Sequence, residues 1–189
     1  MSRDAEADEI LVRSARGGDS GAFVKFSTRW WPPVYRIALN MLGSQSEAAE
    51  AAGRVLLLAL RFPDAAGGEA PFAVSLYGMA IDVTLLRRPR VSQPPIDLAP
   101  RFDWCDSASD LSRRPGLAEA IRQMLQQLDR LDRAVFVLRE LEGFALDETV
   151  AVLRLPEEEV RARGHRAVVQ IGCLIRQMLE GEQIRRTNL

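Results

Sequence analysis

Apolar residues recur at helical spacing along nearly the whole chain, and the sustained alternation typical of strands is absent. In the first half, helices are predicted to end at Gly17-Gly18 and at Gly43, and Asp19 is placed to cap the second helix. Pro32-Pro33 is expected to interrupt that second helix. The pattern as a whole predicts an all-α fold.

Two further signals mark helix starts in the first half. Ser44 with Glu47 three residues later forms a capping-box pattern, and Pro71 suits the first turn of another helix. Residues 89–116 then show no period and are rich in proline, serine and aspartate. This segment is predicted to be a flexible linker, so the expected architecture is two small helical domains.

Helical spacing resumes after the linker and continues to Gly143. A short helix, a turn at residues 154–156 and a long last helix then form a helix-turn-helix pattern. The stripe of the last helix that is predicted to face inward comprises Val160, Ala167, Ile171, Leu174, Ile175 and Met178.

Composition excludes several classes of protein. The chain has 47% hydrophobic and 27% charged residues, and no apolar run approaches the roughly 18 residues that span a bilayer, so no membrane insertion is expected. The acidic N-terminus lacks the apolar stretch of a secretory signal, which favours a cytoplasmic protein. Two distant cysteines and one histidine provide neither a disulfide scaffold nor a metal site. No cofactor motif is present, and an enzyme is the least favoured class.

The exposed side of the last helix carries the candidate chemistry. Its planar guanidinium groups suit phosphate oxygens and guanine edges, although a solvated surface would explain the same spacing. The formal net charge is only −1, so contact with DNA must be local or must depend on a partner. The candidate residues are Arg161, Arg163, His165 and Arg166.

Two groups of segments resemble extracytoplasmic-function sigma factors. The runs AVFVLRELEGF and VRARGHRA, within residues 128–167, are similar to region 4 of that family. The runs DEILVRSARGGDSGAF, VYRIALNMLG and FAVSLYGMAIDV resemble region 2. The resemblance implies a region 2-like domain at 1–88, a linker at 89–116 and a region 4-like helix-turn-helix domain at 117–189.

This resemblance implies a non-enzymatic subunit that binds core RNA polymerase and directs promoter-specific initiation. Region 2 would dock on the β′ clamp and open the downstream promoter element. Region 4 would bind the upstream element and contact the β flap, and an anti-sigma factor is a further expected partner. Arg161, Arg163 and Arg166 stand where the family pattern carries basic residues that face DNA, and His165 is a candidate from the helix pattern alone. The expected polymerase-binding residues are Glu47, Glu50 and Arg54.

A basic cluster follows the helix that resembles the strand-opening helix of region 2. It consists of Arg87, Arg88 and Arg90. Cations near a helix C-terminus interact favourably with its dipole, and the same charges could contact the DNA backbone. Both interpretations stay open at this stage.

The region 2 resemblance departs from the family pattern at functional positions. Gly53 and Arg54 replace an amide-containing pair on the clamp-contact helix, and Ser75 replaces a tryptophan. Gly78 and Ile81 stand where the strand-opening helix is expected to carry basic residues. These changes favour a weakened contact with polymerase or DNA.

Region 4 departs too. Ala145 replaces the serine or threonine cap of the short helix, at a cost of about 1 kcal/mol. Arg154 replaces the turn glycine, and a positive φ there would cost about as much, ~1 kcal/mol. Glu157, Glu158 and Glu159 stabilise a helix N-terminus but repel phosphate, and two of them are spaced to pair with Arg161 and Arg163. We expect weaker and more salt-sensitive promoter binding.

Two other hypotheses remain. A sigma-like protein-interaction module with weakened DNA binding would explain the near-neutral charge and the departures in both regions. An ordinary helix-turn-helix repressor would explain only the C-terminal half of the chain.

Overall fold

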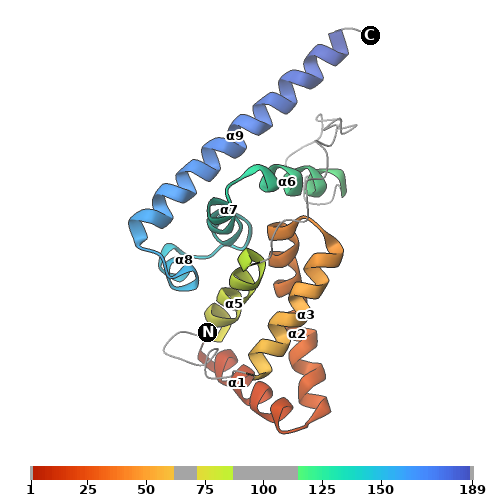
Figure 1. Ribbon diagram of the computed structural model, residues 1–189, viewed down its shortest axis with the longest axis vertical. Coiled ribbons are helices and arrows are strands. Elements are labelled where there is room, and N and C mark those ends of the chain that lie inside the picture. Colours follow the sequence, from red (N-terminus) through yellow and green to blue (C-terminus); the bar gives the residue numbers. More distant parts are fainter. Residues whose placement is uncertain (1, 62–71, 87–114, 188–189) are drawn as a thin grey trace.

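The computed structural model describes residues 2–61, 72–86 and 115–187, and over these ranges it is helical without a strand (Figure 1). The prediction of an all-α fold is confirmed. The first group of helices is α1 (Ser2–Arg16), α2 (Ser20–Leu42), α3 (Gln45–Arg61) and α5 (Phe72–Leu86). The second group is α6 (Pro115–Gln127), α7 (Arg130–Phe136), the π-helical turn η2 (Val137–Leu141), α8 (Leu146–Leu153) and α9 (Glu157–Thr187).

The ends of α2 are set by the residues that the sequence indicates. The Asp19 carboxylate accepts hydrogen bonds from the backbone N–H groups of Gly21 (2.8 Å) and Ala22 (3.1 Å). At the other end Gly43 adopts φ 73°, the left-handed conformation that ends many helices. The predicted start and end of this helix are therefore confirmed.

The predicted break at Pro32-Pro33 is wrong, because α2 runs through both prolines. Each proline removes one intrahelical hydrogen-bond donor. Trp30 before them and Val34 after them are both buried on the same face of α2. Packing of this continuous apolar stripe against the core supports the helix across the prolines, as tertiary contacts commonly do.

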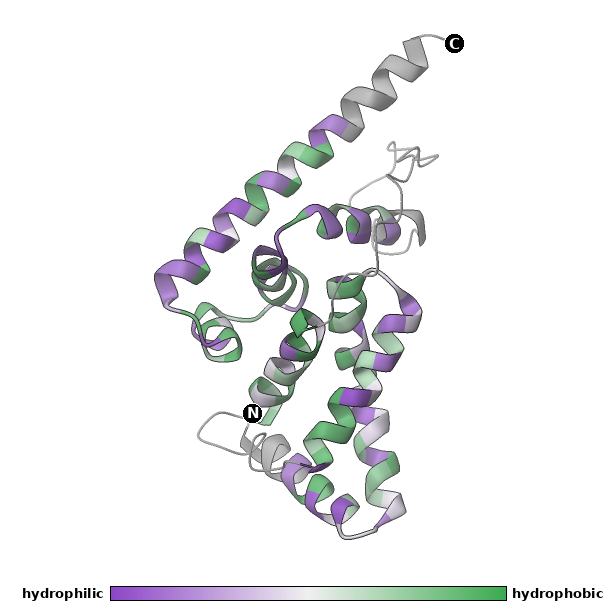
Figure 2. Ribbon diagram, in the orientation of Figure 1, coloured by the Kyte–Doolittle hydropathy of each residue, from purple (hydrophilic) through white to green (hydrophobic). Residues whose placement is uncertain are grey.

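Helix α5 is the centre of the molecule. Figure 2 shows hydrophobic residues along its whole length, with Asp82 exposed among them, and a helix that is apolar over most of its surface needs cover over most of it. Helices α2 and α3 pack on part of its surface, and α8 packs on another part (Figure 1). The buried residues of α5 are Phe72, Val74, Leu76, Gly78, Ala80, Ile81, Val83 and Thr84.

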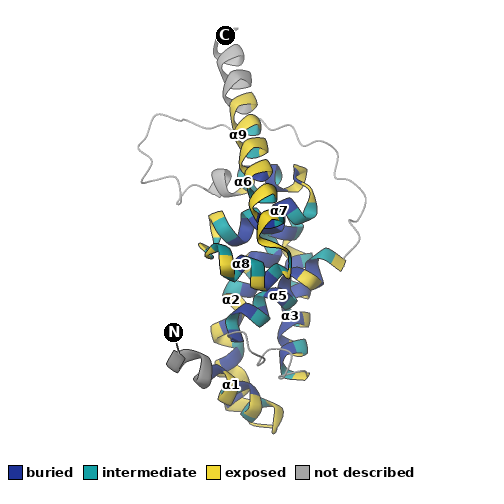
Figure 3. Ribbon diagram, turned by 90° about the vertical axis from the view of Figure 1, so that its left-hand side faces the viewer, coloured by how far each residue is buried: buried dark blue, intermediate teal, exposed yellow. Residues whose placement is uncertain are grey.

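Helix α9 packs on the body through its first half only. Val160 and Ala167 are fully buried, whereas Ile171 and Leu174 are half-buried and Ile175 is exposed. Figure 3 shows α9 becoming mostly exposed as it extends away from the other helices. The predicted inward stripe is thus confirmed near the start of α9 and wrong at Ile175, because no other described helix covers that position. The Met178 side chain lies outside the described residues.

The predicted linker at 89–116 lies almost wholly outside the described residues, as do Arg87, Arg88 and Arg90. Helix α6 begins at Pro115, within the last two positions of that segment. The division into domains at 1–88 and 117–189 stays a prediction. Among the described helices, none combines the length and apolar character that crossing a membrane requires.

Candidate nucleic-acid interface

Helices α8 and α9 form the predicted helix-turn-helix, and both predicted irregularities of this unit are present. Ala145 caps α8 without a side-chain acceptor, although its own backbone N–H donates to Glu148 Oε2 at 2.8 Å. Arg154, at the end of α8, has φ 54° and is the only non-glycine residue in the described ranges with a positive φ. Left-handed backbone is unfavourable for a residue with a Cβ, so this turn is strained.

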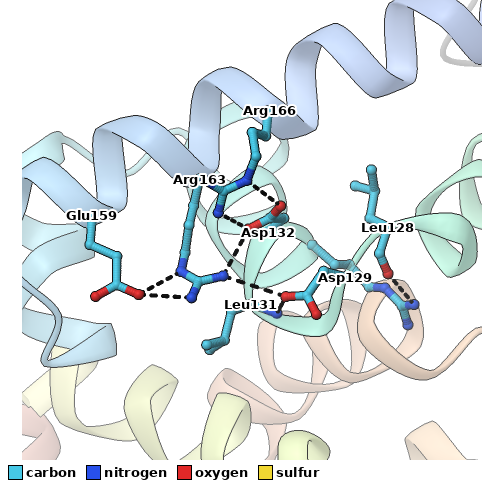
Figure 4. A network of polar contacts seen from close by, with 8 residues as sticks. Leu128, Asp129, Leu131, Asp132, Glu159, Arg163 and Arg166 are labelled. Carbon is cyan, nitrogen blue, oxygen red and sulfur yellow. Dashed lines mark hydrogen bonds and ion pairs between the residues drawn. The ribbon is translucent and has the colours of Figure 1, made fainter.

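A buried carboxylate on α7 anchors the first turns of α9 (Figure 4). Asp132 is only 5% exposed. Its Oδ1 accepts hydrogen bonds from Arg163 Nη1 (2.9 Å) and Arg166 Nη2 (3.0 Å), and its Oδ2 accepts one from Arg166 Nε (3.1 Å). Two arginines one turn apart on α9 therefore share one acid from a different helix.

The electrostatics of this cluster favour the ionised state of Asp132. Burial is the largest single influence and raises the pKa of Asp132, because a desolvated carboxylate is harder to ionise. The hydrogen bonds from Arg166 and Arg163, with their positive charges, outweigh it and leave the pKa below its ordinary value. The pKa of Arg163 is raised, mainly by its hydrogen bond to Glu159 and also by Asp132. The cluster is a charged ion-pair network.

The four candidate DNA-facing residues fall into two groups. The Arg161 side chain is 65% exposed and pairs with Glu157 at 2.7 Å, and His165 is exposed as well. The Arg163 side chain is only 18% exposed and also donates to Glu159 at 2.7 Å. Arg166 shares features of both groups, since it binds the buried Asp132 while 55% of its side chain is exposed. The predicted pairs Glu157–Arg161 and Glu159–Arg163 are confirmed.

The candidate polymerase-binding residues lie on α3. Glu50 and Arg54 are exposed one turn apart, and Glu47 is half-buried in the first turn. The sequence interpretation missed two exposed apolar neighbours, Leu57 on α3 and Trp31 on α2. A leucine three residues after Arg54, on the polar side of an amphipathic helix, was the available signal for Leu57.

Asp132 was also missed, although the sequence contains a signal for it. Leu128, Asp132 and Val135 are spaced as one face of a helix, so the acid falls within an apolar stripe. A buried carboxylate needs cationic partners. Arg163 and Arg166, two of the residues assigned to DNA, supply them from the neighbouring α9.

The basic side chains of this interface are suited to binding an anionic partner. In the ranges that the structure describes, no three acidic, histidine or cysteine side chains converge as a metal site. The exposed functional groups of the first half of α9 are guanidinium, imidazole and carboxylate groups. Such a helix can bind an anionic surface.

Comparison with known proteins identifies the family. The family model for sigma-70, region 4 matches residues 118–171, which contain the helix-turn-helix and its arginines. The ECF RNA polymerase sigma-E factor of Escherichia coli K12 is 26% identical over 172 residues, covering 85% of this chain and 90% of the relative. The ECF RNA polymerase sigma factor SigM of Mycobacterium tuberculosis is 25% identical, covering 97% and 92%. The chain belongs to the extracytoplasmic-function sigma factors of the sigma-70 family.

A solved structure supports the fold of this sigma factor. The structure of CnrH in complex with the cytosolic domain of CnrY matches with a TM-score of 0.64 and 22% identity, covering 90% of this chain and 98% of that chain. Family membership gives the chain a sigma-factor role in transcription initiation. Sigma factors are transcription regulators without an enzymatic reaction of their own.

Proposed function

We propose that this sigma factor binds core RNA polymerase and directs promoter-specific initiation. The observation that carries the proposal is the helix-turn-helix of α8 and α9, with guanidinium groups on the exposed side of α9, within a chain that its RNA polymerase sigma-factor relatives match over most of its length. Region 4 would read the upstream promoter element, and region 2 would contact the β′ clamp.

Within α9, exposure favours Arg161 and His165 as the residues that meet DNA. Both side chains point into solvent, and an exposed ion pair such as Glu157–Arg161 contributes only a few tenths of a kcal/mol, so phosphate can displace the carboxylate. Arg166 can contribute through the exposed part of its guanidinium. Arg163 serves mainly as a positioning residue that holds α9 on α7.

On α3, the exposed row of Glu50, Arg54 and Leu57 is the proposed polymerase surface, with Glu47 at its edge. An apolar side chain flanked by opposite charges combines a contact that excludes water with electrostatic selectivity. Arg87, Arg88 and Arg90 remain candidates for contact with the DNA backbone.

A protein partner completes the proposal. CnrH, which shares the fold, is in complex with the cytosolic domain of CnrY. An anti-sigma factor that binds this chain in a comparable way would keep it from polymerase until a signal releases it.

Two measurements test the function. The full chain should retain core polymerase in a pull-down and support run-off transcription from a cognate promoter. Arg161→Ala with His165→Ala should reduce promoter binding while leaving core binding unchanged. Arg176→Ala is the matched control, because it removes one arginine from the same helix about four turns further along.

The alternative is a sigma-like module that binds a protein partner and has lost useful DNA contact. Its supporting observation is that Arg161, Arg163 and Arg166 all have carboxylate partners within the chain. Retention of core polymerase or an anti-sigma partner without any run-off transcript would favour this alternative and contradict the leading proposal.

A further inference from the structure

The two positions on α5 that lack the expected basic residues are both buried, and one of them, Gly78, lies directly against α8. Ile81 is 1% exposed, and Gly78 is buried. A Cβ at Gly78 would lie only 3.3 Å from the backbone carbonyl oxygen of Val152, near the end of α8. Contact this close between helix backbones depends on the absence of a side chain, so Gly78 allows α8 to pack against α5.

Side chains from the second group of helices also cap the C-terminal ends of α2 and α5. The Arg133 guanidinium donates to the Met41 carbonyl, and Gln126 donates to the Asn40 carbonyl at 3.2 Å. Arg130 donates to the Leu85 carbonyl at 2.7 Å. Helix C-termini expose carbonyls without intrahelical donors and carry partial negative charge, so cationic donors are well matched to them.

Contacts at the edges complete this interface. Arg36 on α2 donates from Nε and Nη2 to both carboxylate oxygens of Glu142, which follows η2. The Tyr77 ring on α5 meets the Phe144 ring edge-on, with centroids 5.0 Å apart. The two groups of helices are therefore joined by apolar, aromatic and ionic contacts within one chain.

We infer that this sigma factor adopts a closed form in which its two groups of helices pack against each other. In this form α8 and α6–α7 cover the face of α5, and the C-terminal ends of α2 and α5, that a promoter strand would need to reach. The functional consequence of the closed form rests on the proposed function: α8 and promoter DNA would compete for the same face of α5. The substitutions at 78 and 81 then have a physical explanation. Neither residue carries a basic side chain; Gly78 admits the backbone of α8, and Ile81 is a buried apolar residue of the same helix.

Closure predicts that polymerase binds an opened form. The apparent affinity for polymerase is the affinity of the open form multiplied by its population, so variants that open the chain should bind core polymerase more tightly. The interface lies within the chain, and the proposed device therefore operates before any anti-sigma partner binds.

Gly78→Leu in the full chain tests the packing of α8 on α5. The added side chain must displace the Val152 carbonyl, so the radius of gyration from small-angle scattering should increase. Hydrogen exchange in residues 146–153 should accelerate about tenfold. Gly172→Leu is the matched control, since a Cβ there meets nothing within 4 Å, and it should change neither measurement.

A charge exchange at the Arg36–Glu142 ion pair provides a second test. Glu142→Arg should open the chain by placing two guanidinium groups together, and Arg36→Glu combined with Glu142→Arg should close it again. The single variant should bind core polymerase about tenfold more tightly, and the double variant should return to the wild-type affinity.

The outcomes separate the two proposals. Unchanged scattering and exchange in folded Gly78→Leu, together with unchanged values in Glu142→Arg, would overturn closure. Opening without a gain in polymerase affinity, when the wild type does bind polymerase, would overturn the inhibitory role. Absence of polymerase binding by every variant would refute the proposed function, whereas scattering and exchange would still decide whether the chain closes.

Discussion

Asp132 on α7 accepts a 2.9 Å hydrogen bond from Arg163 on α9, and this contact joins a buried acid to the second helix of the helix-turn-helix. The same carboxylate binds Arg166. The position of α9 on the body thus depends on a charge cluster behind the surface that we propose to face DNA. The proposed function of α9 therefore predicts that promoter recognition and fold stability are coupled through Asp132.

Asp132→Asn should therefore lower the free energy of unfolding by about 2 kcal/mol, because three charge-assisted hydrogen bonds from two arginines lose their anionic acceptor. Chemical denaturation at neutral pH measures this change. Asp129→Asn is the control. Asp129 is largely exposed and lies 3.5 Å from Arg163, so that variant should lose less stability.

The same pair predicts a pH dependence. The pKa of Asp132 in the folded protein lies below the ordinary value of 3.8, so its stabilising contribution is complete above pH 3.8 and is lost as pH falls through the folded-state pKa. The amide that Asp132→Asn introduces cannot titrate in this range. The difference in unfolding free energy between wild type and Asp132→Asn should stay constant from pH 7 to about pH 5 and shrink below about pH 4. A difference that grew with acid would contradict the assignment.

Arg161 and Arg163 should separate binding from stability. Arg161→Ala should change the unfolding free energy by less than about 0.5 kcal/mol, since its ion pair is exposed. It should lower promoter affinity and reduce the slope of log affinity against log salt by about 0.9, the value for one phosphate contact. Arg163→Ala should instead cost about 1–2 kcal/mol of stability. Fluorescence anisotropy over a salt series, with thermal unfolding of both variants, measures the contrast.

A result in which Arg163→Ala reduces the salt slope without destabilising the protein would reverse these roles. Arg176→Ala, on the same helix, should change neither property.

The regular parts of the fold could be predicted from local chemistry. Asp19 and Gly43 set the ends of α2 through a side-chain acceptor and a left-handed backbone, and both effects depend on a few neighbouring residues. The pairs Glu157–Arg161 and Glu159–Arg163 follow from helical spacing alone. The continuous α2 across Pro32-Pro33 could not be predicted, because burial on both sides of the prolines is a tertiary effect.

The candidate site was only partly predictable for a similar reason. Spacing placed all four residues of α9 away from its apolar stripe, but it could not reveal that α7 supplies an acid beneath two of them. The contact between α5 and α8 was equally hidden. The sequence shows that Gly78 lacks the expected basic side chain, but its structural use depends on Val152, which lies 74 positions further along the chain.

Glu157 should weaken DNA binding in two ways, by repelling phosphate and by holding Arg161. Glu157→Gln removes both effects and should raise promoter affinity severalfold at low salt, with a smaller gain at high salt. Glu158→Gln is a close control, because it removes the same charge from the next position while the Glu157–Arg161 pair remains. Anisotropy titrations should show a larger gain for Glu157→Gln, and equal gains would indicate that only the total charge matters.

The turn between α8 and α9 contains a strained residue, Arg154, and its replacement by glycine should stabilise the protein. Arg154→Gly should relieve the left-handed strain at φ 54°, whereas Arg154→Ala keeps the strain and loses the same exposed ion pair to Asp82, which contributes little at 3.6 Å. The glycine variant should be more stable than the alanine variant by about 1 kcal/mol. Ala145→Ser should add about 1 kcal/mol independently, because Glu148 already forms its half of a capping box and the hydroxyl would supply the other half. Denaturant titration of the two single variants and their combination should give nearly additive gains, since each acts at a different end of α8. An alanine variant as stable as the glycine variant would show that Arg154 is not strained in solution.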